Sequence, residues 1–338
     1  MKIMVTGGTG FVGGRVAAGL LERGDKVVAL AREPGKAAPL AAAGAKVVQG
    51  DLTEPSSLSA AARGCDTIVH AAGLPLAASR KVFHRIHVEG SRNVVRAAQT
   101  AGVRRLVNIA SDAVVFAGRD LRDADESMPY PARFIDVYSE TKALGEQQAL
   151  AGHGRSGLQV TSLRPAIVWG RGDTTVLPIM AKLAAGWFGI PAIGKGENLE
   201  ASCHIENLLA GVLAALDAPE AHGRAYFLLD DFQVGWREFL TRQMEAVGIR
   251  PKFLSVPAAL AVPAAWALDR GADLLGLTVP LAYFGVRSAM TNRHYCTTRA
   301  HDELGYRPRV GFEEGLEDLG RWVEEIGGRD ALIAQARL

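Results

Sequence analysis

Tyr138 and Lys142 are four residues apart in a stretch of sequence that reads as a helix. Residues at i and i+4 share one helix face, so the ammonium group of Lys142 can lie beside the phenol of Tyr138 and favour its ionised form. An unperturbed phenol has a pKa near ~10, which is too high for general-base work at neutral pH until a nearby cation lowers it. The pair is therefore predicted to transfer a proton. Next to a hydride carrier, it would interconvert an alcohol and a ketone.

A glycine-rich segment at the start of the chain could bind such a carrier. Residues 6–13 read TGGTGFVG and stand between a strand-like run, Lys2–Thr6, and a helix-like run over residues 11–23. Glycines at this spacing make a tight turn and let the backbone approach a pyrophosphate, which then lies on a helix N-terminus. The segment predicts a dinucleotide site that includes Gly7, Gly10, Phe11, Val12 and Gly13.

The end of the second strand-like run bears on the choice of dinucleotide. An acidic side chain there would bind a ribose 2′-hydroxyl, but Ala31 is followed by Arg32, which suits a 2′-phosphate. NADP(H) is favoured, and NAD(H) stays possible because Glu33 lies beside Arg32. After the third run come Asp51 and Leu52, where a carboxylate could accept from the adenine amino group or cap the next helix.

The elements that must position these residues alternate along the first half of the chain. Strand-like and helix-like runs follow one another, a pattern that predicts an α/β fold with a Rossmann-like, doubly wound parallel sheet covered by helices on both faces. We expect residues 1–169 to form the dinucleotide-binding domain with the catalytic residues. Residues 170–338 should form mainly a smaller C-terminal substrate lobe, with segments such as 205–230 returning to the core.

Composition argues against several classes of protein. The net charge is +2, with lysine and arginine scattered, so no nucleic-acid partner is expected. Cys65, Cys203 and Cys296 form no metal-ligand pattern, which predicts no metal site and favours a reducing cytoplasm. The apolar residues 253–268 are too few for a transmembrane helix and include two prolines. They predict a buried lobe core or, alternatively, a greasy substrate mouth or peripheral contact with a membrane.

Several motifs together resemble those of the extended short-chain dehydrogenases/reductases, the NAD-dependent epimerase/dehydratase superfamily. They are the glycine-rich opening, Asp51-Leu52, His70-Ala71-Ala72-Gly73, Ser111, the Tyr138/Lys142 pair, Arg164-Pro165 and the closing run from Glu303 to Pro308. The sequences around Ser111 and Tyr138 are similar to the 3β-hydroxysteroid dehydrogenase branch, especially sterol-4-carboxylate 3-dehydrogenases and 2-alkyl-3-oxoalkanoate reductases.

The resemblance implies roles for individual residues. Tyr138 would be the acid/base, Lys142 would lower its pKa and bind the nicotinamide ribose, and Ser111 would hold the substrate oxygen. It also implies cofactor contacts from Ala71, Ala72, Gly73 and Pro165, besides Tyr138 and Lys142. A homodimer through the tyrosine-bearing helix is expected by analogy.

Three positions depart from the family pattern. Ala110 replaces the usual Ser or Thr before the catalytic serine, and His87 stands where an asparagine usually helps to order the active-site helix. We expect His87 to be a structural substitute for that asparagine. Asp112 invites comparison with sugar 4,6-dehydratases, but those place a glutamate next, where this chain has Ala113.

The substrate side of the site is less defined. The expected lining includes Asp112, Arg164, Arg171 and His204, although a lone histidine such as His204 is more often structural. Trp187, Phe188, Ile190, Pro191 and Ile193 are expected to give the lobe an apolar lining, which favours a hydrophobic sterol-, fatty-acid- or polyketide-like molecule. The alternatives are a nucleotide-sugar epimerase with bound NAD, a dihydroflavonol-reductase-like enzyme, and a cofactor-sensing protein without catalysis.

Overall fold

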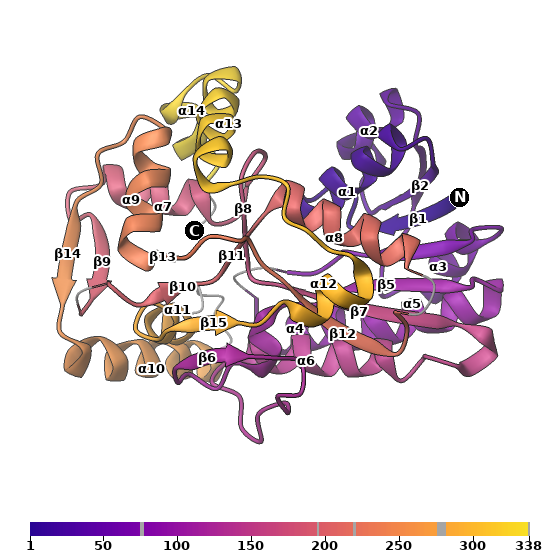
Figure 1. Cartoon of the computed structure of the whole chain (residues 1–338), viewed down its shortest axis with the longest axis horizontal. Helices are drawn as coiled ribbons and strands as arrows, with labels where there is room; N and C mark the ends of the chain where they lie inside the picture. The colour runs from indigo at the N-terminus through magenta and orange to yellow at the C-terminus, as the bar shows by residue number, and fades with distance from the viewer. Residues whose placement is uncertain (75–77, 195, 219–220, 276–281, 337–338) are drawn as a thin grey trace.

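The computed structural model describes residues 1–74, 78–194, 196–218, 221–275 and 282–336. Its centre is a seven-stranded parallel sheet in the order β12-β7-β5-β4-β1-β2-β3 (Figure 1). The strands are β1 (Lys2–Thr6), β2 (Lys26–Ala31), β3 (Lys46–Gln49), β4 (Thr67–His70), β5 (Arg105–Ile109), β7 (Gln159–Pro165) and β12 (Arg224–Leu228). This sheet confirms the predicted Rossmann-like, doubly wound fold.

The strand order reverses direction between β1 and β4. The chain runs outward through β2 and β3 on one side, and then crosses back to β4, β5 and β7 on the other. Thr6 and His70 pair at the ends of β1 and β4, so the residues that follow these two strands lie side by side. Open α/β sheets bind ligands at such a switch point, beyond the carboxyl ends of the strands.

Helices cover both faces of the sheet. One face buries apolar residues of α1 (Phe11–Glu22), α2 (Ala38–Ala42), α8 (Ile205–Asp217) and α12 (Thr298–Leu304). The other buries residues of α3 (Pro55–Ala62), α5 (Gly90–Ala101) and α6 (Val137–Leu150). Figure 1 shows the two layers above and below the strands. Because both faces are covered, the central strands consist almost entirely of buried residues, as the apolar runs in the sequence indicated.

The second half of the chain is divided between the sheet and a separate cluster. β12 is a strand of the central sheet, paired with β7, and α8 packs against one face of that sheet. A different apolar cluster joins α7 (Leu177–Ala185), β9 (Ile190–Ile193), α9 (Trp236–Ala246), β14 (Phe253–Val256), α13 (Phe312–Glu325) and α14 (Arg329–Ala334). Short strand pairs lie between these two bodies of structure: β6 (Leu121–Ala124) with β15 (Arg293–Tyr295), β8 (Ile167–Trp169) with β11 (Ser202–His204), and β10 (Leu199–Glu200) with β13 (Val234–Gly235).

The residues expected to give the lobe an apolar lining are divided between its surface and its interior. Trp187 and Phe188 are 90% and 76% exposed in the turn between α7 and β9, whereas Ile190 and Ile193 are buried in the lobe. Both exposed rings follow Gly186, the residue at which α7 ends. These residues therefore say little about the substrate.

Helix α10 (Ala258–Leu275) carries much of the apolar stretch identified in the sequence and packs against α11 (Ala282–Ser288). Its outward side chains include Leu274, which is 87% exposed. Among the described helices, none combines the length and apolar character that crossing a membrane requires.

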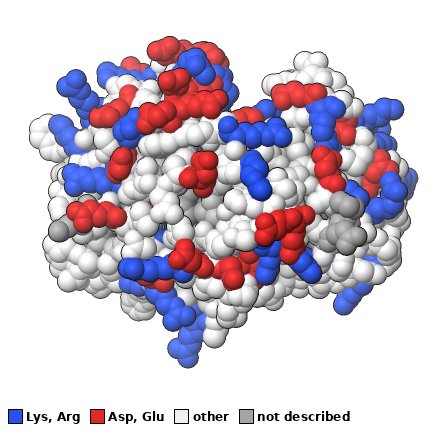
Figure 2. All heavy atoms as spheres, viewed as in Figure 1, with Lys and Arg blue, Asp and Glu red and all other residues white. Residues whose placement is uncertain are grey.

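The remaining short elements are α4 (Arg80–Phe83), a π-helical segment η2 (His84–Glu89), and three 3₁₀ turns, η1 (Pro34–Ala37), η3 (Asp112–Val115) and η4 (Arg155–Gly157). Charges of both signs are intermixed on the face seen in Figure 2, in which a notch separates α13 and α14 from α1 and α2.

Candidate active site

The glycine loop between β1 and α1 has the shape that a phosphate needs. Gly7 has a φ of +74°, and a Cβ on Gly13 would overlap the carbonyl oxygen of Gly7. The amide of Gly10 donates to that same carbonyl at 2.9 Å and closes the turn. No side chain caps the N-terminus of α1, and Phe11 and Val12 are partly exposed there. The uncapped amides and the bare backbone fit a pyrophosphate.

The loop after β4 packs directly against the glycine loop. A Cβ on Gly7 would lie 2.8 Å from the Cα of Ala72, which is too close for any side chain. The hydroxyl of Thr6 accepts from the amide of Ala72 at 3.2 Å and contacts His70 Nδ1 at 2.8 Å. The backbone from Ala71 to Gly73 is thereby held at the switch point of the sheet.

The side chains that bear on cofactor choice lie at the ends of β2 and β3. Arg32 is exposed, while its neighbour Glu33 is paired with Lys36 at 2.7 Å. Asp51 accepts from the amide and hydroxyl of Thr53, both at 2.7 Å. Burial acts against these bonds, yet the pKa of the Asp51 carboxyl is lowered, so Asp51 stays ionised. Leu52 is buried beneath it.

Ser111 is the second residue after the end of β5. Its hydroxyl oxygen accepts from the amide of Ala113 at 3.2 Å and caps the short turn that follows. The hydroxyl donates to the carboxylate of Asp112, also at 3.2 Å. The serine is thus oriented from both sides.

Tyr138 is the second residue of α6, a helix that begins where Asp136 accepts from the amide of Ser139 at 2.9 Å. Removal from water raises the pKa of Tyr138 to about 12. Hydrogen bonding with Ser111 and the charge of Arg293 act in the opposite direction, while Asp112 and Asp136 add to the rise. The structure therefore brings Ser111 and Tyr138 together at the end of β5.

Lys142 follows Tyr138 by one turn of α6, as the spacing indicated. Its ammonium donates to the carbonyl of Ile109 at 3.0 Å, and burial lowers its pKa to about 8. Burial outweighs the charges that act on the phenol, and Arg293 is one cation that lowers its pKa. The lowering of the pKa of Tyr138 by Lys142 stays a prediction.

Three rings surround the ring of Tyr138. Phe83, His87 and Phe284 make edge-on contacts with it, at centroid distances of 6.2, 5.8 and 6.0 Å. Phe284 also meets Phe116 edge-on at 6.1 Å. These contacts come from α4, η2 and α11, so they restrict the orientation of the ring.

His87 ties the loop after β4 to the helix that carries Tyr138. Its Nε2 accepts from the amide of Leu74 at 3.0 Å, and its Nδ1 lies 3.0 Å from the hydroxyl of Thr141. Burial holds the pKa of His87 well below its usual range, with Lys142 contributing, so the ring is neutral. This geometry suits a structural substitute for an ordering asparagine.

Three of the expected substrate residues are engaged elsewhere. Arg164 is only 4% exposed and pairs with Glu146 at 2.9 Å, so it joins β7 to α6. Arg171 pairs with Asp318 at 3.0 Å and with Glu325 on α13. The expectation that these arginines line a substrate mouth is not supported, because each already has carboxylate partners from within the chain.

His204 has a structural position as well. Its Nδ1 accepts from the amide of Glu206 at 3.3 Å and caps α8, and its ring meets Trp169 at 4.7 Å. The fourth candidate, Asp112, lies directly beside Ser111. Pro165 is buried at the end of β7.

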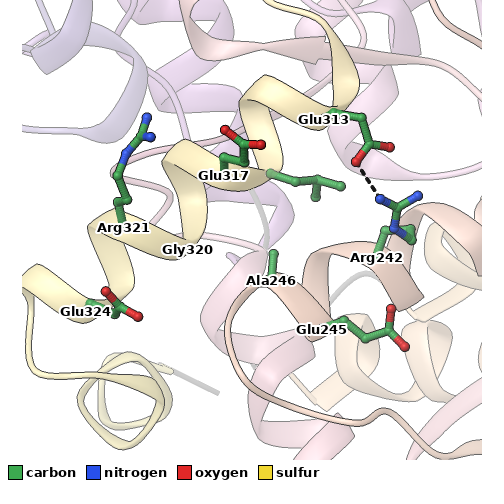
Figure 3. Close-up of a pocket in the computed structure, with 9 residues that line it drawn as sticks. Arg242, Glu245, Ala246, Glu313, Glu317, Gly320, Arg321 and Glu324 are labelled. Carbon is green, nitrogen blue, oxygen red and sulfur yellow. Dashed lines mark hydrogen bonds and ion pairs between the residues drawn. The ribbon is translucent and has the colours of Figure 1, made fainter.

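A groove of about 570 Å³ lies away from these residues, between α9 and α13 (Figure 3). Arg242 and Glu313 form an ion pair across it, and glutamates line much of its wall. Charges of both signs in an open groove give no chemistry for ketone reduction. Among the described residues, no group of three or more His, Cys, Asp or Glu side chains could hold a metal ion.

Sequence reasoning missed three residues near the centre. Glu146 follows Lys142 by four residues, so the same helical spacing that paired Tyr138 with Lys142 could have found it. Phe284 and Arg293 come from α11 and β15, and the sequence carries no local signal that either would reach Tyr138.

Comparison with known proteins agrees with this geometry. The model of the 3-beta hydroxysteroid dehydrogenase/isomerase family matches residues 4–258. A 3-beta-hydroxysteroid dehydrogenase of Mycolicibacterium neoaurum is 31% identical over 99% of this chain and 94% of its own length. A 4-hydroxy-2-methyl-3-oxo-4-farnesyl-3,4-dihydroquinoline-1-oxide ketoreductase of Stigmatella aurantiaca is 34% identical over 94% of this chain and 96% of its own.

A 2-alkyl-3-oxoalkanoate reductase of Shewanella oneidensis is 31% identical over 93% of this chain and 84% of its own length. Among solved structures, gox2253 superposes with a TM-score of 0.77 at 25% identity, covering 96% of this chain and 98% of that one. The chain therefore belongs to the 3-beta hydroxysteroid dehydrogenase/isomerase family, and it is an NAD(P)-dependent oxidoreductase that acts on CH–OH groups.

Proposed function

We propose that this protein uses NADP(H) to interconvert a ketone and a secondary alcohol on a hydrophobic substrate, with Tyr138 as the acid/base. The observation that carries the proposal is the meeting of Ser111 and Tyr138 beyond the end of β5, beside the loops that follow β1 and β4.

Each residue has a distinct task in this proposal. The phenol of Tyr138 gives its proton to the carbonyl oxygen during reduction, or takes it back from the alcohol during oxidation. When substrate is bound, Ser111 exchanges its hydrogen bond to Asp112 for one to the same oxygen and holds that oxygen within reach of the phenol. Lys142 binds the nicotinamide ribose next to Tyr138. A bound nicotinamide dinucleotide supplies the hydride, or accepts it.

The loops that would hold the dinucleotide come from four strands. The amides at the start of α1 receive the pyrophosphate, with Gly7, Gly10 and Gly13 making room for it. The backbone from Ala71 to Gly73 and Pro165 would lie along the nicotinamide half. Arg32 is the candidate for the 2′-phosphate: the pairing of Glu33 with Lys36 supports this, because that carboxylate has a partner other than Arg32.

Apolar side chains next to the phenol support a hydrophobic substrate. Phe116 belongs to an apolar cluster that extends from Ala110 to β15, and Phe284 packs against this cluster. The relatives are named for a steroid, a farnesylated quinoline and an alkyl oxoalkanoate, which are all largely apolar.

We also infer the domain organisation, the oligomeric state and the cellular compartment of the protein. Residues 1–169 would bind the dinucleotide and residues 170–338 mainly the substrate. By analogy with extended members, two copies would associate through the helix that carries Tyr138. Free thiols at Cys65, Cys203 and Cys296 suit a reducing, cytoplasmic setting.

The decisive test is Tyr138→Phe in a substrate screen. NADPH and NADP⁺ turnover is measured against a 3-ketosteroid, a 2-alkyl-3-oxo acid, an aromatic ketone and a UDP-sugar, with the corresponding alcohols. We expect turnover of one of the apolar ketones, and a loss of at least roughly a hundredfold in the variant because the proton donor is gone. NADPH binding, followed by fluorescence, should be retained.

Tyr226→Phe is the matched control. It removes a buried phenolic hydroxyl that donates to Glu303 at 2.7 Å, on the opposite side of β7 from Ser111's strand. Activity should survive this change. Unchanged turnover in Tyr138→Phe would remove the acid/base assignment, and turnover of the UDP-sugar alone would favour an epimerase.

A further inference from the structure

Four polar side chains are buried together behind Ser111. Asp112, Glu200, Arg293 and Tyr295 are 3%, 5%, 1% and 4% exposed. They come from the turn after β5, from β10 and from β15, and Asp112 and Tyr295 are 183 residues apart in the sequence. Burying an arginine and two carboxylates is costly, so a cluster of this kind needs close pairing.

Arg293 is the centre of the cluster. One end of its guanidinium lies 3.4 Å from the carboxylate of Asp112, and the other is paired with Glu200. Its Cζ atom lies 5.6 Å from the ring centroid of Phe116. Both carboxylates therefore depend on this one cation for compensation.

The cluster connects directly to the proposed catalytic pair. Ser111 donates to Asp112, and it is the same Ser111 whose hydroxyl meets Tyr138. If the carboxylate of Asp112 rotated freely, the hydroxyl of Ser111 could point in several directions and still donate to it. An ion pair with a buried guanidinium at 3.4 Å favours one orientation of the carboxylate over the others.

We propose that Arg293 is a positioning residue: it clamps Asp112 from a strand of the C-terminal half, and through Asp112 it fixes the hydroxyl of Ser111 beside Tyr138. This inference rests on the proposed function of Tyr138. It also makes the C-terminal half part of the catalytic centre, because Arg293 reaches the site only when β15 is paired with β6.

Arg293 also acts on the phenol through its charge. The charged and titratable groups that face Tyr138 are Asp112 from η3, Arg293 from β15, Asp136 at the start of its own helix, and His87 from η2. Asp112 raises the pKa of Tyr138 and Arg293 lowers it. Removing either one should therefore move the pH profile, and the two changes should move it in opposite directions.

The experiment compares Arg293→Met, Arg293→Lys and Asp112→Asn in the full-length protein. For each variant, kcat and KM for alcohol oxidation with NADP⁺ are measured across pH, with the member of the panel that turns over. Arg293→Met should shift the rising limb of kcat up by about one pH unit, since it removes a nearby opposite charge. Asp112→Asn should shift the limb down. Arg293→Lys should keep the wild-type limb and lose only part of kcat.

Stability is controlled in two ways. Arg23→Met removes an arginine that is paired with two carboxylates, Asp25 at 2.6 Å and Asp217 at 3.2 Å, at the far end of α1, and it should leave the profile unchanged. The double variant Arg293→Met/Glu200→Gln keeps the net charge of the cluster at that of the wild type and should still show the upward shift. Thermal unfolding identifies any variant that fails to fold.

A mutant cycle separates positioning from general packing. If Arg293 acts through Asp112, Arg293→Met should change kcat for ketone reduction at neutral pH, where Tyr138 is protonated, by at least fivefold in the wild type and by less than twofold in Asp112→Asn. Equal losses in both backgrounds, or limbs that shift in the same direction, would overturn the inference. If Tyr138→Phe retains activity, the proposed function itself has failed instead.

Discussion

At the scale of single residues, the phenol of Tyr138 is held in its protonated form. Burial raises its pKa to about 12, well above neutral pH. A group in that state is ready to donate a proton, which suits reduction of a ketone. Oxidation needs the phenolate, so its rate should rise with pH until the phenol is ionised.

Arg32 is a second residue with a sharp expected effect. If it binds a 2′-phosphate, Arg32→Ala removes a charge-assisted hydrogen bond worth roughly 1.5–3 kcal/mol, or about tenfold or more in affinity. Binding of NADPH should weaken by that factor while NADH binding changes little, as measured by fluorescence titration of both.

Lys26→Ala is the control for Arg32→Ala, because it removes an exposed cation at the opposite end of the same strand, β2. It should leave the ratio of the two affinities as it was. Equal weakening of NADPH and NADH by Arg32→Ala would count against recognition of the 2′-phosphate.

At the scale of elements, the crossing of α6 over the π-helical segment η2 sets the position of Tyr138. Gly145 makes that crossing possible, because a Cβ there would overlap the carbonyl of His87. That carbonyl also accepts from Ser91 at 2.6 Å, while the ring of His87 contacts Thr141 on α6. The π-helical turn thus places His87 in contact with Gly145, Ser91 and Thr141.

Gly145→Ala should separate α6 from η2 and move Tyr138 relative to Ser111. Misplacement by about 1 Å can cost roughly a hundredfold in rate, so we expect a loss of ten- to a hundredfold in kcat. The measurement is steady-state kinetics on folded protein, checked by circular dichroism.

The matched control is Gly271→Ala in α10, where a Cβ would meet nothing within 4 Å. That change should stabilise its helix by about 1 kcal/mol and leave kcat intact. Full activity in Gly145→Ala would mean that α6 does not depend on this close crossing.

At the scale of the whole molecule, two buried histidines link stability to pH. Burial lowers the pKa of His70 to about 3 and that of His87 well below its usual range. In the unfolded chain both return to about 6.5. Below that pH the unfolded state binds protons that the folded state does not, so the free energy of unfolding falls as pH falls.

The expected slope is roughly 1.4 kcal/mol per pH unit for each histidine, from about pH 6 downward. His70→Gln should remove one such contribution, which urea unfolding at pH 4.5, 5.5 and 7.5 can measure. His84→Gln, at an imidazole that is 50% exposed, should change the slope much less. A slope that is the same in His70→Gln and wild type would show that His70 is not buried in its neutral form.

The sequence by itself determined the architecture of the first half of this protein. The strand expected at Lys2–Thr6 has those bounds, and the helix expected over residues 11–23 ends one residue earlier, at Glu22. Strand and helix periods, and glycines that end helices, are local signals. The spacing of Tyr138 and Lys142, and the glycine loop, are local too, so the residues proposed for the site could be named before any fold was known.

Only the tertiary structure decided which charges meet. Arg171 pairs with Asp318 and Arg293 with Glu200, across 147 and 93 residues, and no local pattern specifies such partners. For the same reason Arg164, a candidate for the substrate mouth, lies in a buried ion pair with Glu146. Arg293 lies near Tyr138, although no local feature of the sequence predicted it there. The sequence specifies which side chains are charged. The burial and the partners that set their pKa values and pairing energies arise only when distant segments pack together.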